Sequence, residues 1–99
     1  MTQKIKVRIP QITSIFIAIK LYYERIELSN ADIRSLFGNL SSCTVAKLKD
    51  MARQKMIENN VPIWNAQRVN TEAAYEAWGL NIDDLERRYE KLKHFDKMA

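Results

Sequence analysis

The residues best suited to chemistry in this 99-residue chain lie between Ser41 and Arg53, and the chemistry they favour is the binding of a polyanion. Ser41 and Ser42 carry hydroxyl groups that suit phosphate oxygens, as do the free backbone N–H groups of a helix that begins there. Basic side chains follow at Lys47, Lys49 and Arg53. This stretch is therefore the first candidate for a binding site.

The distribution of charge supports this choice. Residues 1–60 hold ten lysines and arginines against five acids, a net charge of +5, whereas residues 61–99 hold six against seven, a net charge of −1. A clustered positive field attracts nucleic acid or an anionic membrane. A solvated face with more lysine than glutamate explains the same counts equally well.

Catalysis and metal binding find little support in the sequence. There is no glycine-rich phosphate loop and no HExxH motif, and the one histidine, His94, is close to the C-terminus. The one cysteine, Cys43, excludes an internal disulfide and, with a single histidine, a zinc cluster. A thiol at a helix N-terminus can be nucleophilic, but a small surface side chain is the simpler interpretation. We expect no enzymatic activity and no metal or other cofactor. We also expect the protein to be cytoplasmic, in a reducing environment.

Two helical patterns and a short turn would position the candidate residues. Ser29 can cap the first helix, and Gly38 stands where that helix ends. Ser41 or Ser42 can cap the second, longer helix. We therefore predict a helix-turn-helix over residues 29–57. The predicted buried faces are Ile33, Leu36 and Phe37, then Val45, Leu48, Ala52 and Met56; the other faces of the second helix carry Ser42, Lys47, Lys49, Asp50, Arg53 and Gln54.

The chain before this motif predicts a strand and a helix. Residues 4–9, KIKVRI, alternate charged and apolar side chains at period two, as in a half-buried strand. Pro10 suits the first turn of a helix, and apolar residues keep helical spacing from Ile12 to Ile26. We expect this helix to be the main core element. Its apolar stretch is too short to span a bilayer.

After the motif, the sequence predicts a hairpin and two helices. Residues 61–64 and 68–69 look extended around the polar turn 65–67. A helix capped by Asn70 or Thr71 and closed by Gly79 should follow. Asn81 then caps a last helix, with Asp84 three residues further on.

The last helix, within residues 81–99, has an apolar stripe with two interpretations. Leu85, Tyr89 and Leu92 lie in this stripe at near-heptad spacing, which would suit a dimerisation seam. The stripe covers only about two heptads, too few to hold an isolated pair of helices. Packing of the stripe against its own domain is the alternative.

Two stretches resemble known families of DNA-binding proteins. SSCTVAKLKD is similar to the start of recognition helices, which commonly carry a serine, a Thr-Val pair and a leucine three residues later. RVNTEAAYEAWGL resembles the wing-to-helix junction of small excisionase-type winged proteins from phages and mobile elements. The resemblance covers roughly residues 29–80. It implies a mainly α fold with a small β-hairpin wing at 61–69, namely a winged helix-turn-helix domain over 1–80 with an additional helix over 81–99.

The resemblance implies that the second helix of the motif enters the major groove of duplex DNA. Lys47 would then reach guanine O6 or N7, and Asp50 could accept from cytosine N4. Lys49 and Arg53 would hold the phosphate backbone. The residues expected at the DNA are Ser41, Ser42, Cys43, Thr44, Ala46, Lys47, Lys49, Asp50 and Arg53 in the helix, and Asn65, Gln67 and Arg68 in the wing.

Two functions follow as expectations. The first is double-stranded DNA binding by a transcriptional regulator or a recombination and excision accessory factor, with no membrane partner and no small-molecule ligand evident. The second is a protein-interaction or dimerisation module that kept the winged fold without binding DNA, since fold alone does not decide function. A homodimer through the last helix is compatible with both.

Overall fold

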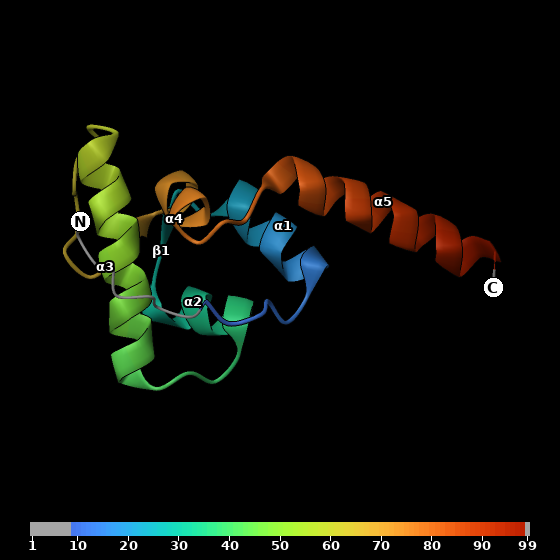
Figure 1. Ribbon diagram of the computed structural model, residues 1–99, viewed down its shortest axis with the longest axis horizontal. Coiled ribbons are helices and arrows are strands. Elements are labelled where there is room, and N and C mark those ends of the chain that lie inside the picture. Colours follow the sequence, from blue (N-terminus) through green and yellow to red (C-terminus); the bar gives the residue numbers. More distant parts are fainter. Residues whose placement is uncertain (1–8, 99) are drawn as a thin grey trace, which may run out of the picture.

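The computed structural model describes residues 9–98, which form five α-helices and one two-stranded antiparallel sheet (Figure 1). The predicted class, mainly helical with a small sheet, is confirmed. The predicted strand at residues 4–9 lies almost entirely outside the described residues. The elements in chain order are α1 (Ile15–Glu24), β1 (Glu27–Leu28), α2 (Asn30–Phe37), α3 (Ser42–Glu58), β2 (Val69–Asn70), α4 (Thr71–Ala77) and α5 (Ile82–Met98).

The first helix begins later than the sequence predicted. Ser14 is its N-cap, and the Ser14 hydroxyl accepts from the backbone N–H of Ile17 at 3.3 Å. Pro10 therefore precedes the helix and does not lie in its first turn. The physical reason is a competing interaction: the backbone N–H of Thr13 donates to the carbonyl of Leu36 at 2.7 Å, and the Thr13 hydroxyl donates to the carbonyl of Ser35 at 2.9 Å. These bonds hold the chain against the end of α2.

The core is centred on α4, and the prediction that the first helix is the main core element is wrong. In α1 only Ala18 and Leu21 are buried. Tyr75 and Trp78, at α4 and its C-cap, are almost fully buried and join the other helices to one another. The Tyr75 hydroxyl donates to the carbonyl of Ala18 at 2.5 Å, and the Trp78 indole N–H donates to the carbonyl of Leu48 at 2.9 Å. The small residues of α4 pack closely against α3, and the long Tyr75 side chain reaches α1.

The two helices of the predicted motif form with the predicted caps. Ser29 and Asp32 make a capping box at the start of α2, and Ser41 caps α3 through the backbone N–H of Thr44. Gly38 ends α2, as predicted, with φ +98° and ψ −169°, a conformation that favours glycine. All the residues predicted for the two buried faces are buried: Ile33, Leu36, Phe37, Val45, Leu48, Ala52 and Met56.

The predicted hairpin wing at residues 61–69 is wrong. Strand β2 pairs instead with β1, which lies between α1 and α2, and Leu28 stands opposite Val69. Both of these side chains are fully buried, so the pairing with β1 gives Val69 a place in the core. Residues 61–68 form a loop with a turn at Asn65, whose carbonyl accepts from the N–H of Arg68 at 3.1 Å. Pro62 has no N–H to contribute to a second strand.

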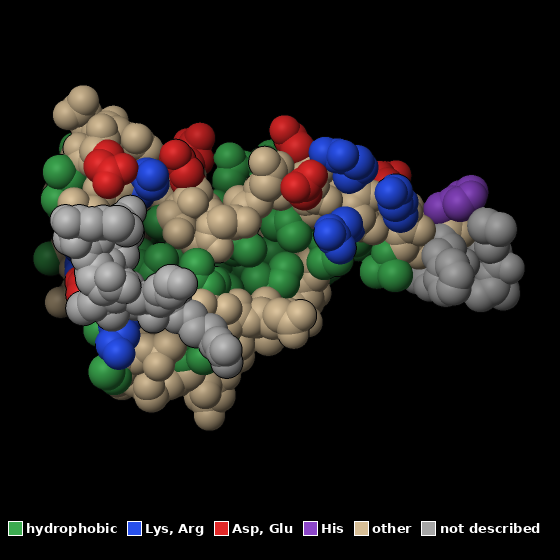
Figure 2. All heavy atoms as spheres, viewed as in Figure 1, with side chains coloured by type: hydrophobic (Ala, Val, Ile, Leu, Met, Phe, Trp, Pro, Cys, Tyr) green, Lys and Arg blue, Asp and Glu red, His purple; other side chains and the backbone are tan. Residues whose placement is uncertain are grey.

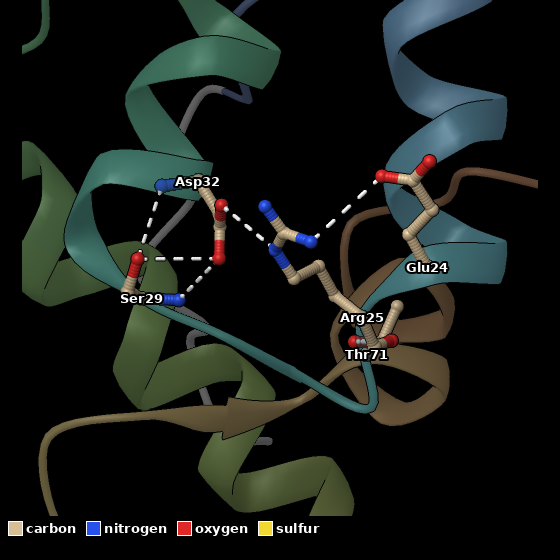
Figure 3. Close-up of polar contacts among 5 residues, drawn as sticks. All are labelled: Glu24, Arg25, Ser29, Asp32 and Thr71. Carbon is tan, nitrogen blue, oxygen red and sulfur yellow. Dashed lines mark hydrogen bonds and ion pairs between the residues drawn. The ribbon is translucent and has the colours of Figure 1, made fainter.

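A polar corner connects α1, α2 and α4 (Figure 3). The Arg25 guanidinium lies 3.5 Å from Asp32 and 3.8 Å from Glu24. Asp32 also completes the cap on Ser29, so the start of α2 is tied to the end of α1. The Thr71 hydroxyl donates to the carbonyl of Arg25 at 2.6 Å. The corner therefore sets the angle at which α2 leaves the body.

The last helix packs on α1 with its first half and then extends beyond the body (Figure 1). Its predicted cap is confirmed, because the Asn81 side chain accepts from the N–H of Asp84 at 3.0 Å. Leu85 is buried, and the ring of Tyr89 lies 5.9 Å from that of Phe16. Of the helices in the described residues, none is long and apolar enough to cross a membrane.

Candidate nucleic-acid interface

Among the described residues, one face of α3 is exposed along the length of the helix. Because the opposite face is buried in the core, side chains half a turn away point outward along the whole helix of 17 residues, about 25 Å in length. Thr44 is half-buried, and its hydroxyl lies 3.0 Å from that of Ser41 within the helix cap. The predicted contact residues that are exposed here are Ser41, Ser42, Cys43, Ala46, Lys47 and Asp50.

Lys49 is buried, so its predicted place on the exposed flank is wrong. Only 8% of this residue is exposed. Lys49 lines a crevice between α2 and α3 together with Asn30 and Arg34. Burial lowers the pKa of the Lys49 ammonium, and the positive charge of Arg53 lowers it further. The negative charge of Asp50 raises this pKa, but by less.

Arg53 is held by the protein instead of standing free for DNA. Its guanidinium donates to the carbonyl of Ala66 and lies 3.7 Å from the carboxylate of Asp50. The side chain keeps 29% of its surface exposed. Arg53 therefore fastens the loop 61–68 to the flank of α3, and its predicted contact with the phosphate backbone is limited to the N–H groups that these two partners leave free.

The loop 61–68 runs beside the second half of α3, to which Arg53 fastens it (Figure 1). Asn65, Gln67 and Arg68 are exposed, as predicted, although the Asn65 side chain also accepts from the N–H of Gln67 at 2.7 Å. The sequence interpretation overlooked Trp64, which is 72% exposed. A signal was present in Pro62, which argues against a paired strand and so against burial of the apolar residues around it.

The predicted dimerisation residues divide into two groups. Leu85 belongs to the core, which corrects its assignment to a seam, and Tyr89 is half-buried beside Phe16. The ammonium of Lys93 lies 5.4 Å from the centre of the Tyr89 ring. Leu92 keeps 49% of its surface exposed. Of the three predicted seam residues, only Leu92 is half-exposed on the part of α5 beyond the body.

Positive charge is concentrated on the α2–α3 part of the molecule. Residues 30–68 hold six lysines and arginines against three acids, a net charge of +3, whereas residues 82–94 hold four against four. The basic side chains that gather on α5 in Figure 2 are therefore balanced, as in the ion pairs of Arg87 with Asp84 at 2.9 Å and Lys93 with Glu90 at 3.5 Å. Lys4, Lys6 and Arg8 lie outside the described residues.

No protein-family model, curated protein or solved structure matches the chain. The function has to be inferred from the geometry of α3, the loop that Arg53 holds beside it, and the charge around them.

Proposed function

We propose that the protein binds double-stranded DNA by inserting the outer face of α3 into the major groove. The observation that carries this proposal is the exposure of one continuous face of a helix whose opposite face is anchored in the core. A helix is about 10–12 Å across with its side chains, and the major groove is about 12 Å wide. The surplus of positive charge in residues 30–68 surrounds this helix.

The exposed side chains of α3 suit different parts of a duplex. Lys47 can donate to guanine O6 and N7, and Asp50 can accept from cytosine N4. Ala46 is small and apolar, so it can lie against a thymine methyl group. Ser42, in the first turn of α3, can donate to a phosphate together with the backbone N–H groups there.

The loop 61–68 would serve as the wing of a winged helix-turn-helix domain. Gln67 and Arg68 can reach phosphates or the minor groove beside the major groove that α3 occupies. Arg53 would act on DNA chiefly through this loop, by keeping it close to the helix. Such a protein would act as a transcriptional regulator or as an accessory factor in recombination or excision, without enzymatic activity of its own.

Selection of bound duplexes from a random pool tests the proposal. We expect enrichment of a short sequence, and we expect Lys47→Ala to relax preference at one base pair by about 1–3 kcal/mol. Lys55→Ala is the matched control, because the Lys55 ammonium lies 3.2 Å from Glu58 and 3.8 Å from Glu76 and so is already neutralised. Equal losses in the two variants would contradict the assigned helix face.

A second candidate function is a protein-interaction module, and the shape of α5 favours it. The second half of this helix leaves the body, and Leu92 lies half-exposed on it. A second copy of the chain could cover this stripe. Light scattering tests the seam: the wild type should be a dimer and Leu92→Asp a folded monomer. A wild type that forms this dimer but binds no duplex would favour the interaction module over DNA binding.

A further inference from the structure

A small crevice separates α2 from the first half of α3. Its volume is about 90 Å³, equivalent to about three water molecules of the bulk liquid. Asn30 and Arg34 line it from adjacent turns of α2, and Ser42, Ala46 and Lys49 line it from successive turns of α3. The crevice thus has two cationic side chains and two neutral hydrogen-bonding side chains around a space suited to a small anion.

The two cations at the crevice have no carboxylate partner among residues 9–94. Asp50 is 3.7 Å from Arg53, and Asp32 is engaged with Arg25 at 3.5 Å. The Arg34 Nε–H donates to the carbonyl of Leu40 at 3.3 Å, which leaves the other N–H groups of its guanidinium for a ligand. Residues 1–8 contain no acid at all. Lys49 is only 8% exposed and forms no ion pair among residues 9–94, so it gains when an anion occupies the crevice.

We propose that this crevice binds a phosphate group between Arg34 and Lys49. Phosphate accepts several charge-assisted hydrogen bonds at once, from the arginine fork and from the lysine ammonium. The Ser42 hydroxyl and the Asn30 amide add neutral donors. This inference rests on the proposed DNA function: the phosphate belongs to the DNA backbone at the edge of the groove that α3 enters.

The site would set how closely the duplex approaches the two helices. Arg34 and Lys49 belong to different helices, so one phosphate between them would join α2 and α3 to the same strand. A backbone contact of this kind fixes register and carries no sequence information. The crevice therefore contributes to the affinity for DNA and fixes the position of the protein on it, while the outer face of α3 determines which base sequence is preferred.

Inorganic phosphate tests the site without DNA. The variant Lys49→Met keeps most of the aliphatic stem and removes the charge, and Lys55→Met is the matched control on the opposite flank. Phosphate stabilises folded proteins in general, so we expect it, compared with chloride at equal ionic strength, to raise the midpoint of thermal unfolding of the wild type and of Lys55→Met by more than that of Lys49→Met. Backbone NMR shifts should localise binding to Asn30, Arg34 and Lys49. Equal stabilisation of all three proteins, or shifts elsewhere, would overturn the proposal.

Salt titrations on a duplex test the DNA source of the phosphate. Loss of one phosphate contact should reduce the slope of log affinity against log salt by about 0.9, so the advantage of wild type over Lys49→Met should shrink about 3.5-fold between 50 and 200 mM salt. If the wild type binds DNA and the Lys49→Met slope is unchanged, this inference fails while the proposed function stands. If phosphate occupies the crevice but no duplex binds, the proposed function fails and the site serves a free phosphate.

Discussion

The two tryptophans give a matched pair of perturbations that tests the core. Trp78 is 2% exposed, and its indole N–H donates to the carbonyl of Leu48, whereas Trp64 is 72% exposed. Trp78→Phe removes one buried hydrogen bond, worth about 1 kcal/mol, and leaves a small cavity that adds about 1–2 kcal/mol. We expect a loss of about 2–3 kcal/mol in the free energy of unfolding. For a domain of this size this lowers the unfolding midpoint by about 10–20 °C.

Trp64→Phe is the control, with an expected change within about 0.5 kcal/mol because the side chain is on the surface. Urea unfolding followed by fluorescence measures both variants, since each leaves a single tryptophan as reporter. The Trp64→Phe protein should show a large red shift on unfolding, and the Trp78→Phe protein only a small one. Equal stabilities would refute the assignment of Trp78 to the centre of the core, and a buried emission spectrum from Trp64 would refute its exposure.

Three further outcomes follow from named contacts. Leu85→Asp buries a charge, so it should lower the free energy of unfolding by more than about 4 kcal/mol and unfold the protein. Leu92→Asp should leave the circular dichroism spectrum unchanged, because Leu92 is half-exposed. Unfolding of both variants would contradict the exposure of the second half of α5. Burial raises the pKa of Tyr75, so on raising the pH the unfolded chain loses this proton before the folded protein does. The free energy of unfolding should therefore fall as the pH rises above about 10. If the Tyr75→Phe variant loses stability over the same pH range to the same extent, Tyr75 is not the cause. Arg53→Ala should speed hydrogen exchange at residues 65–68, whereas Arg68→Ala should not.

Local signals in the sequence were sufficient to predict the caps and the buried faces of α2 and α3. Ser29, Ser41 and Asn81 each accept the N–H three residues further on, as the side chains of good N-caps do. Helical spacing likewise identified Leu48 and Met56 as buried. These features depend on residues within two turns of one another, which is why a single sequence contains them.

Long-range pairing was not predictable in the same way. The partner of β2 lies 42 residues earlier in the chain, in a two-residue strand with too little alternation to be detected. The sequence therefore favoured the nearby residues 61–64 as the pairing partner of the strand at 68–69. Burial of Lys49 also depends on the angle between α2 and α3, which the corner at Arg25 and Asp32 helps to set. Periodicity placed Lys49 beside the buried face without showing that α2 would cover it.

Measurement of duplex binding as a function of salt, for the wild type and for Lys47→Ala, tests DNA binding through α3 most directly. We predict a linear fall of log affinity with log salt for both proteins, with weaker discrimination between selected and unrelated duplexes in Lys47→Ala. Binding that is insensitive to salt, or discrimination that survives loss of the Lys47 ammonium unchanged, would contradict it.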